Sequence, residues 1–385
     1  MPEDWQNAGF GLYIHWPFCQ AKCPYCDFNS HVTAQIDQST WANAYISEID
    51  RIGLGTSDRV LNTMFFGGGT PSLMAAETVD AVITHARKTW HFANDIEITL
   101  EANPTSVEAS RFAGYHDAGV NRVSIGVQSL RDDDLRRLGR LHSKDEALSA
   151  IEIARNTFPR MSFDLMYGRQ DQTAKDWEAE LNEAIGFAAD HLSLYQLTVE
   201  DGTAFGDRYK AGRLLGLPDD DLSVQLFEIT QEICEHNGLP AYEVSNHAPA
   251  DSESRHNMIY WRYGDYAGIG PGAHGRLTIQ GQKIATEAEK LPGKWLSGVS
   301  SGMAELPRTV ISSSDQAAEY LMMGLRLSEG VDVDRFAAIS GMPINQDHIK
   351  QLCEDDLMIL DENRIKTTRR GRLILNAVIE ALLRD

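Results

Sequence analysis

The feature that most constrains this chain is a run of three cysteines near its start. Cys19, Cys23 and Cys26 lie within eight residues, and the 385-residue chain has only five cysteines. Pro24 and the polar residues between the thiols are typical of a loop rather than of a buried element. Such a run offers three soft ligands, one fewer than a [4Fe–4S] cluster normally takes. A cluster held in this way would keep one iron free for a small chelating molecule.

Zinc is the main alternative metal that these thiols could bind. Cys3His zinc sites exist, and either His15 or His31 could complete one. A disulfide fits the sequence less well, because three closely spaced thiols leave one unpaired and nothing indicates secretion. The remaining cysteines, Cys234 and Cys353, lie in apolar helical patterns, so we interpret them as small core residues.

Composition and charge narrow the class of protein. The chain is 42% hydrophobic, which is enough for one large core and a smaller domain. Its formal net charge of −21 disfavours nucleic-acid binding, which needs a cationic surface. No apolar run approaches the ~18 residues of a membrane span, and no secretion signal is apparent. We therefore expect a cytoplasmic protein with no nucleic-acid partner and no transmembrane segment, for which peripheral membrane contact stays open.

Up to residue 240, apolar strand-like runs alternate with amphipathic helical runs. The predicted strands cover residues 12–15, 63–66, 97–100, 122–125, 162–166 and 191–197. The predicted helices cover residues 39–53, 75–90, 106–118, 132–155, 173–188 and 220–237. Six consecutive βα units predict an α/β fold with a parallel sheet and outer helices, arranged either as a barrel or as a doubly wound sheet.

Polar and glycine residues cluster at the ends of the predicted strands. They are, in chain order, Gly67, Gly68, Gly69, Glu101, Asn103, Gln128, Asp164, Thr198 and Glu200. In a barrel the C-terminal strand ends share one mouth, so we expect these groups to gather around the cysteines. Asp164 lies inside an apolar strand and needs a partner or a ligand there. The glycines could also form a flexible turn, and Glu101 could simply begin a helix.

Arg140 and the stretch after residue 240 leave more alternatives open. Arg140 either pairs with Asp145 or Glu146 on a surface helix or binds a carboxylate ligand. Residues 242–245 are predicted as a further strand. The motif His256-Asn257-Met258-Ile259-Tyr260-Trp261 and the glycine-rich residues 264–275, which include His274, predict loops that suit a flat aromatic ligand or a metal. Histidines packed inside a loop are the alternative. Residues 277–313 are predicted as a connector with a short hairpin.

The C-terminal part predicts a module of its own. Helices are expected at 315–327, 332–340, 346–355 and 371–383, and strands at 357–360 and 364–368. The first three helices and a two-stranded wing indicate a winged-helix-like arrangement. The predicted division of the chain is 1–240, 241–313 and 314–385. The one basic patch consists of Arg364, Lys366, Arg369, Arg370 and Arg372, and it forms either a solvated hairpin or a docking surface for an acidic partner or for propionates.

Several motifs together resemble the HemW family of haem chaperones, in the HemN-like branch of the radical S-adenosylmethionine (AdoMet) superfamily. They are Tyr13, the Cys19-Cys23-Tyr25-Cys26 run, the Gly67 to Pro71 run, Glu101-Ala102-Asn103-Pro104, Gly126-Val127-Gln128-Ser129, Asp164 to Gly168 and the His256 to Trp261 motif. The resemblance covers nearly the whole chain. It implies a partial (β/α)6 TIM-like barrel with a C-terminal winged-helix-like α+β domain.

The resemblance also implies roles for individual residues. Cys19, Cys23 and Cys26 would ligate a [4Fe–4S] cluster whose free iron binds AdoMet. The residues that match AdoMet-contacting positions are Tyr13, Tyr25, Gly67, Gly68, Gly69, Glu101, Gln128, Arg140, Asp164 and Thr198. The residues associated with haem are His256, Asn257, Tyr260, Trp261 and His274. No catalytic residue is assigned.

The implied function is to bind haem and pass it to an apo-haem protein, such as a membrane respiratory enzyme. The alternative is an oxygen-independent coproporphyrinogen III oxidase, which uses AdoMet radicals to decarboxylate propionates. Two features favour the chaperone: Phe28 stands where that enzyme has a fourth cysteine, and Tyr13 lies near the start, without a long preceding extension. The chain departs from many HemW relatives at Arg169-Gln170-Asp171, where they have Leu-Pro-Gly, and the role of this loop stays open.

Overall fold

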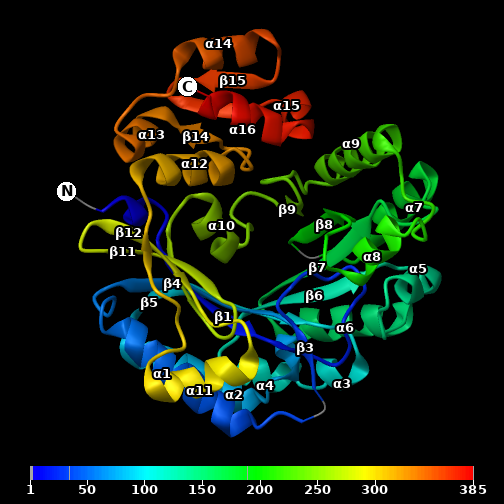
Figure 1. Ribbon diagram of the computed structural model, residues 1–385. Helices are drawn as coiled ribbons and strands as arrows, with labels where there is room; N and C mark the ends of the chain where they lie inside the picture. Colours follow the sequence, from blue (N-terminus) through cyan, green and yellow to red (C-terminus); the bar gives the residue numbers. More distant parts are fainter. Residues whose placement is uncertain (1–2, 34, 189, 385) are drawn as a thin grey trace.

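A sheet whose parallel strands are neighbours in chain order organises the first two thirds of the chain (Figure 1). We describe it from a computed structural model covering residues 3–33, 35–188 and 190–384. The six expected strands are β1 (Phe10–Trp16), β4 (Val60–Gly68), β5 (His91–Ala102), β6 (Arg122–Gln128), β7 (Arg160–Tyr167) and β8 (Leu192–Gln196). Each pairs in parallel with the next along the chain. This order, which never reverses, is that of a partial (β/α)6 barrel and not of a doubly wound sheet.

Helices cover the outer face of these strands (Figure 1). They are α1 (Gln38–Gly53), α2 (Ala76–Thr89), α3 (Ser106–Ala109), α4 (Phe112–Asp117), α5 (Asp132–Arg137), α6 (Lys144–Thr157), α7 (Ala174–Ile185) and α9 (Asp220–His236). The short α8 (Ala204–Lys210) lies instead beside the cysteine loop. In α2, Val79, Val82, Ile83 and Ala86 recur at helical spacing and are buried. The regularly spaced apolar residues that predicted the helices are therefore the residues that pack into the core.

Two barrel helices expected as continuous are broken. Residues 106–118 form α3 and α4, and residues 132–155 form α5 and α6. Between α5 and α6, Gly139 has a left-handed backbone (φ +70°), and a Cβ there would lie 2.7 Å from Pro24 Cδ. Close approach of the cysteine loop therefore requires glycine and ends α5 early. The sequence analysis also missed α8.

Beyond residue 240 the chain continues the same sheet. The expected strand at 242–245 is wrong, because the paired residues are those of β9 (Asn246–His247), antiparallel to β8. The Glu243 carboxylate accepts hydrogen bonds from Ser245 N (3.0 Å) and Asn246 Nδ2 (2.5 Å), so this stretch bends instead of extending. The expected loops are also partly wrong: they contain α10 (Arg255–Trp261) and β10 (Asp265–Ile269), which pairs in parallel with β1.

Residues 277–313 are not a simple connector. The expected hairpin is present as β11 (His274–Ile279) and β12 (Gln282–Glu287), and with β13 (Thr309–Val310) it extends the main sheet to eleven strands. The glycine- and serine-rich part forms α11 (Pro292–Ser301). Its Trp295 is fully buried and stacks on Trp41 of α1, with ring centroids 5.4 Å apart. This stretch therefore belongs to the barrel core.

The C-terminal module has its own hydrophobic core and the expected winged-helix-like arrangement. Its elements are α12 (Ser313–Gly324), β14 (Val331–Asp332), α13 (Val333–Ser340), α14 (Gln346–Glu354), β15 (Met358–Asp361), β16 (Arg364–Thr367), α15 (Arg369–Leu373) and α16 (Leu375–Leu383). The last expected helix is interrupted at Ile374. The predicted domain boundaries stay predictions. Within the described ranges, every helix is too short or too polar to cross a bilayer.

We predict that Asp265→Ala strongly destabilises the fold. Asp265 is fully buried and accepts from Arg59 Nη1 (2.6 Å) and Lys283 Nζ (2.8 Å), so its loss leaves two buried cations uncompensated. We expect the free energy of unfolding, measured by urea denaturation, to fall by about 3–5 kcal/mol.

Asp95→Ala is the matched control, because Asp95 pairs with Arg255 at the surface. We expect this variant to lose at most about 1 kcal/mol. Equal losses in the two variants would contradict the importance of the buried cluster.

Candidate functional site: two adjoining cavities at the barrel mouth

The cysteine loop is anchored at its base by the end of β4. It begins in β2 (Phe18–Cys19), which pairs with β3 (His31–Val32) and so closes residues 20–30 into a loop. Thr70 N donates to Phe18 O (2.8 Å), and a Cβ on Gly69 would lie 2.7 Å from the same oxygen. Glycine at position 69 therefore lets two backbones approach closely.

The rest of the loop is held by distant parts of the chain. Asn29 Nδ2 donates to Pro271 O (2.8 Å) and to Lys290 O (2.8 Å). On the other side, Phe205 N at the start of α8 donates to Pro24 O (2.8 Å). The positions of the three thiols therefore depend on the whole barrel and not on the loop alone.

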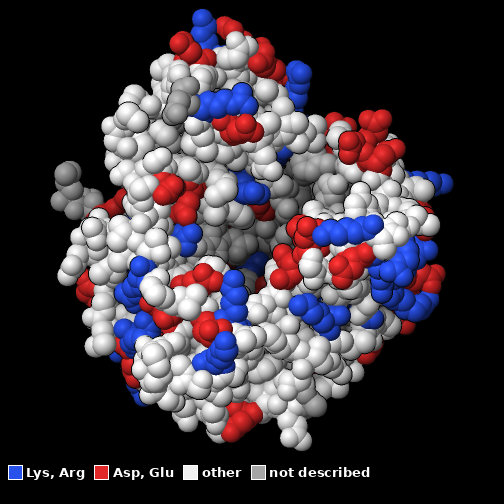
Figure 2. All heavy atoms as spheres, viewed as in Figure 1, with Lys and Arg blue, Asp and Glu red and all other residues white. Residues whose placement is uncertain are grey.

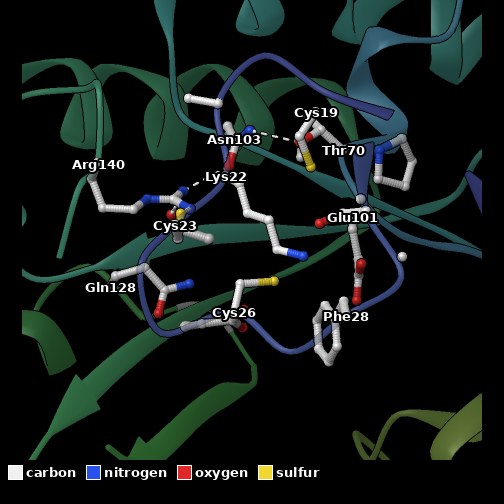
Figure 3. Close-up of a pocket in the computed structure, with 18 of the residues that line it drawn as sticks. Cys19, Lys22, Cys23, Cys26, Phe28, Thr70, Glu101, Asn103, Gln128 and Arg140 are labelled. Carbon is white, nitrogen blue, oxygen red and sulfur yellow. Dashed lines mark hydrogen bonds between the residues drawn. The ribbon is translucent and has the colours of Figure 1, made fainter. Parts of the chain in front are cut away.

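The thiols of Cys19, Cys23 and Cys26 line one cavity of about 160 Å³ (Figure 3). Thr70 Oγ1 donates to Cys19 Sγ (3.4 Å), and Arg140 Nη1 donates to Cys23 Sγ (3.6 Å). Burial raises the pKa of the Cys19 and Cys26 thiols. Thiolates here consequently need nearby positive charge, which Arg140 provides and which bound iron would add.

The donor set fits a cluster better than a single zinc ion. Among the residues that the structure describes, no three His, Cys, Asp or Glu side chains lie close enough together to hold one metal ion. His15 is engaged at both ring nitrogens, by Tyr13 OH (3.0 Å) and by Asn29 O (2.9 Å), and His31 contacts Asn29 Oδ1 (3.2 Å). Thiolates that bind different irons of a cube lie further apart than ligands of one ion, as these do.

The structure brings most of the predicted AdoMet residues to this cavity. Besides the cysteines, the lining includes Tyr25, Gly68, Gly69, Glu101, Gln128, Arg140 and Asp164. Three predicted residues are not among the lining, and one of them, Tyr13, lines an adjoining cavity instead. Gly67 lies under the Tyr13 ring, and Thr198 is exposed beyond the end of β8. Residues at the ends of β4, β5, β6 and β7 therefore gather around the cysteines as predicted, whereas Thr198 after β8 does not.

Glu101 and Asp164 form a carboxyl pair on the cavity wall. Burial, together with the nearby Asp164 carboxylate, raises the pKa of Glu101 to about 8. Burial likewise raises the pKa of Asp164 to about 6, although hydrogen bonds from Ser193 and Ser124 oppose this. A cationic ligand in the cavity would favour the ionised form of both carboxyls.

Arg140 lies in the break between α5 and α6 and turns towards the cavity (Figure 3). It pairs with neither Asp145 nor Glu146. Its Nη2 donates instead to Asn103 Oδ1 (2.6 Å) and Gly126 O (2.6 Å). Arg140 thus connects the ends of two strands to a cysteine sulfur.

Arg169 has a role that its sequence context did not indicate. Its side chain is buried, forms an ion pair with Asp134 (3.0 Å) and donates to the Glu180 carboxylate. Glu180 also accepts from Ser129 Oγ (2.7 Å), directly after Gln128, which has a left-handed backbone (φ +68°). This network holds the turn that presents Gln128 to the cavity.

A larger cavity of about 690 Å³ adjoins the first. Its lining consists of Tyr13, His15, Lys22, Asp27, Phe28, Asn29, Gly68, Glu101, Tyr260, Tyr266, Gly272, His274 and Lys290. Lys22, Phe28, Gly68 and Glu101 line both cavities. Figure 2 shows the molecule hollowed between the C-terminal module and the barrel, with both signs of charge around the opening.

His256 lies behind this cavity and not in it. It is buried against the Phe65 ring, with its Nδ1 2.7 Å from Thr63 Oγ1 and its Nε2 2.8 Å from Tyr260 OH. Burial lowers the pKa of His256 to about 3, so the imidazole is neutral. Of the five predicted haem-associated residues, only Tyr260 and His274 line the cavity; His256, Asn257 and Trp261 do not.

The fold resembles a solved structure along almost its whole length. The coproporphyrinogen III oxidase HemN from Escherichia coli superposes with a TM-score of 0.81 at 21% identity, covering 97% of this chain and 90% of that chain. At this identity the likeness shows the fold alone. Residues 13–184 match the Radical SAM superfamily, and residues 311–374 match the HemN C-terminal domain.

Closer sequence relatives carry two names. "Heme chaperone HemW" of Escherichia coli strain K12 is 37% identical, covering 97% of this chain and 98% of that protein. The Haemophilus influenzae protein of the same name is 36% identical with the same coverage. The bovine "Radical S-adenosyl methionine domain-containing protein 1, mitochondrial" is 36% identical, covering 97% of this chain and 87% of that protein. The chain belongs to the HemW family of the radical SAM superfamily.

Proposed function

We propose that this protein is a cytoplasmic haem chaperone that carries a [4Fe–4S] cluster with AdoMet and passes haem to an apo-haem protein, such as a membrane respiratory enzyme. The observation that carries the proposal is the adjoining pair of cavities. One is lined by three cysteines, and the other has aromatic walls and an exposed histidine. The names of the bacterial relatives support haem as the cargo.

In the smaller cavity, Cys19, Cys23 and Cys26 would hold the cluster and leave one iron for AdoMet. When bound and reduced, the cluster supplies an electron to the AdoMet sulfonium; we propose that cleavage of AdoMet is not the main task here. The backbone at Gly68 and Gly69 reaches the cavity without side chains, so carbonyl groups there can accept from an ammonium group. The residue that balances a cationic ligand would be Glu101.

The larger cavity suits a flat aromatic ligand with acidic groups. Its volume of about 690 Å³ lies within the roughly 300–1,000 Å³ of ligand pockets. Tyr260 and Tyr266 pack edge to face with centroids 4.3 Å apart, which gives a rigid aromatic wall. Lys22 and Lys290 line the opening and can pair with propionates. We assign His274 as the candidate iron ligand and His256 as the residue that positions Tyr260.

We predict that Cys19→Ala, Cys23→Ala and Cys26→Ala each abolish the ~400 nm absorbance of anaerobically purified protein, because each removes a cluster ligand. Cys353→Ala is the matched control, since this thiol lies in the C-terminal module, and it should keep the absorbance. Retention of the absorbance in all three ligand variants would refute the cluster assignment.

The Glu101→Gln variant tests the environment of the carboxyl pair. The pKa of Glu101 is raised in the folded state, so the folded protein keeps a proton that the unfolded chain releases between about pH 4.5 and pH 8. Stability from this group is therefore lost as the pH rises through that window.

We expect Glu101→Gln, measured by urea unfolding of cluster-free protein, to gain at least about 1 kcal/mol relative to the wild type between pH 5 and pH 8. Glu152→Gln, on the exposed face of α6, should show no such trend. If the two variants behave alike, the Glu101 environment is not as described.

Haem titration under anaerobic conditions tests the chaperone function. We predict a Soret shift on binding that changes in position in His274→Ala, because that variant removes a proposed iron ligand. His256→Ala should weaken haem binding several-fold without changing the band position, because Tyr260 loses its hydrogen-bond partner. His236→Ala, at the exposed end of α9, is the control and should bind as the wild type does.

Two outcomes would contradict the haem assignment. One is the absence of any Soret shift in the wild type, with His256→Ala and His274→Ala unchanged. The other is decarboxylation of coproporphyrinogen III with consumption of AdoMet, which would indicate the oxidase instead.

A further inference from the structure

The expected basic patch of the C-terminal module is not one surface. Lys366 Nζ pairs with Asp361 (2.9 Å), and Arg364 Nε donates to Glu329 O (2.9 Å). Arg369 contacts Glu232 of α9 (3.2 Å). Arg370 is exposed and is 3.4 Å from Asp355 O. Arg372 differs from the other four in its surroundings.

Arg372 opens onto a cavity of about 210 Å³ between the barrel and the C-terminal module. Figure 1 shows α15, which carries Arg372, facing α9 across this junction. The lining residues are Phe227, Gln231, Glu235, Pro240, Ala241, Thr367, Arg369 and Arg372. This cavity is separate from the two at the barrel mouth, because it shares no lining residue with either of them.

The Arg372 side chain lacks an acceptor among the described residues at this cavity. Within the described part of the chain, the Arg372 guanidinium has no hydrogen-bond acceptor and no carboxylate within 4 Å. Burial lowers the pKa of Arg372, yet an arginine remains charged at neutral pH. The guanidinium is half-buried, and the carboxylate whose charge favours its ionised form is that of Glu243. An arginine that makes no ion pair within 4 Å keeps its donors available for an anion in the cavity.

We propose that this cavity binds the hydrogen-phosphate group of free phosphate or of a phosphate monoester. The forked guanidinium of Arg372 matches two phosphate oxygens. Arg369 is near the surface and can turn from Glu232 to the anion. The Glu235 carboxylate on the opposite wall can accept a hydrogen bond from the P–OH group of hydrogen phosphate. Sulfate has no such proton at neutral pH and cannot form this hydrogen bond.

The bound anion would join two parts of the fold. Gln231 and Glu235 belong to α9 of the barrel, whereas Thr367, Arg369 and Arg372 belong to the C-terminal module. Binding therefore stabilises the present arrangement of the module over the barrel, which closes one side of the hollow seen in Figure 2.

Calorimetric titration of the full-length protein with inorganic phosphate, glycerol 1-phosphate and sulfate tests this proposal. We expect phosphate to bind at one site, sulfate to bind at least about tenfold more weakly, and Arg372→Gln to weaken phosphate binding at least about tenfold. Arg370→Gln, on the same helix but outside the cavity lining, should change it less than about twofold. Tighter binding of glycerol 1-phosphate than of phosphate would identify a monoester as the source.

Thermal unfolding in phosphate-free buffer separates a ligand site from a structural charge. Arg372→Gln should leave the Tm unchanged or raise it, because the variant removes a half-buried cation that makes no ion pair within 4 Å in the described part of the protein. Glu235→Gln should bring the affinities for sulfate and phosphate closer together. No detectable binding of either phosphate compound, or unchanged phosphate affinity in Arg372→Gln with a lowered Tm, would overturn the proposal.

Discussion

The site depends on how closely the end of β4 approaches the cysteine loop. Gly69 has no side chain, and the space where its Cβ would stand is taken by Phe18 O. This contact brings Thr70 to the sulfur of Cys19 and holds the base of the loop in place. The loop has little core of its own, so the spacing of its three thiols is inherited from the barrel.

The two cavities share a wall and therefore share electrostatics. Glu101 lines both, and its raised pKa reflects burial beside a second carboxyl. A cation in the small cavity changes the charge of that wall, and with it the surroundings of a ligand in the large one. His256 lies behind the wall of the large cavity, where its neutral ring links Thr63 to the wall residue Tyr260 by hydrogen bonds.

Much of this arrangement follows from sequence periodicity. The six strands, most helices and the gathering of Gly68, Glu101, Gln128 and Asp164 at one mouth were predictable, because parallel strands place their carboxyl ends together. The C-terminal module was predictable because its helices and wing each carry a clear pattern. The resemblance to the HemW family added roles that periodicity alone does not give.

The remainder depended on contacts between distant residues. The break at Gly139 comes from its contact with Pro24, and α11 was hidden by a glycine- and serine-rich composition around a single buried tryptophan. Nothing local distinguishes a buried His256 from one facing a ligand. The role of the Arg169 loop likewise stayed open in the sequence, because the partners of Arg169, Asp134 and Glu180, lie in two other elements, α5 and α7.

The central claim is that three thiols hold an iron–sulfur cluster and leave one iron open. Quantitative iron, acid-labile sulfide and zinc analysis of protein purified without oxygen tests it most directly. The account predicts about four irons and about four sulfides per chain, with negligible zinc. One zinc per chain without sulfide would contradict it.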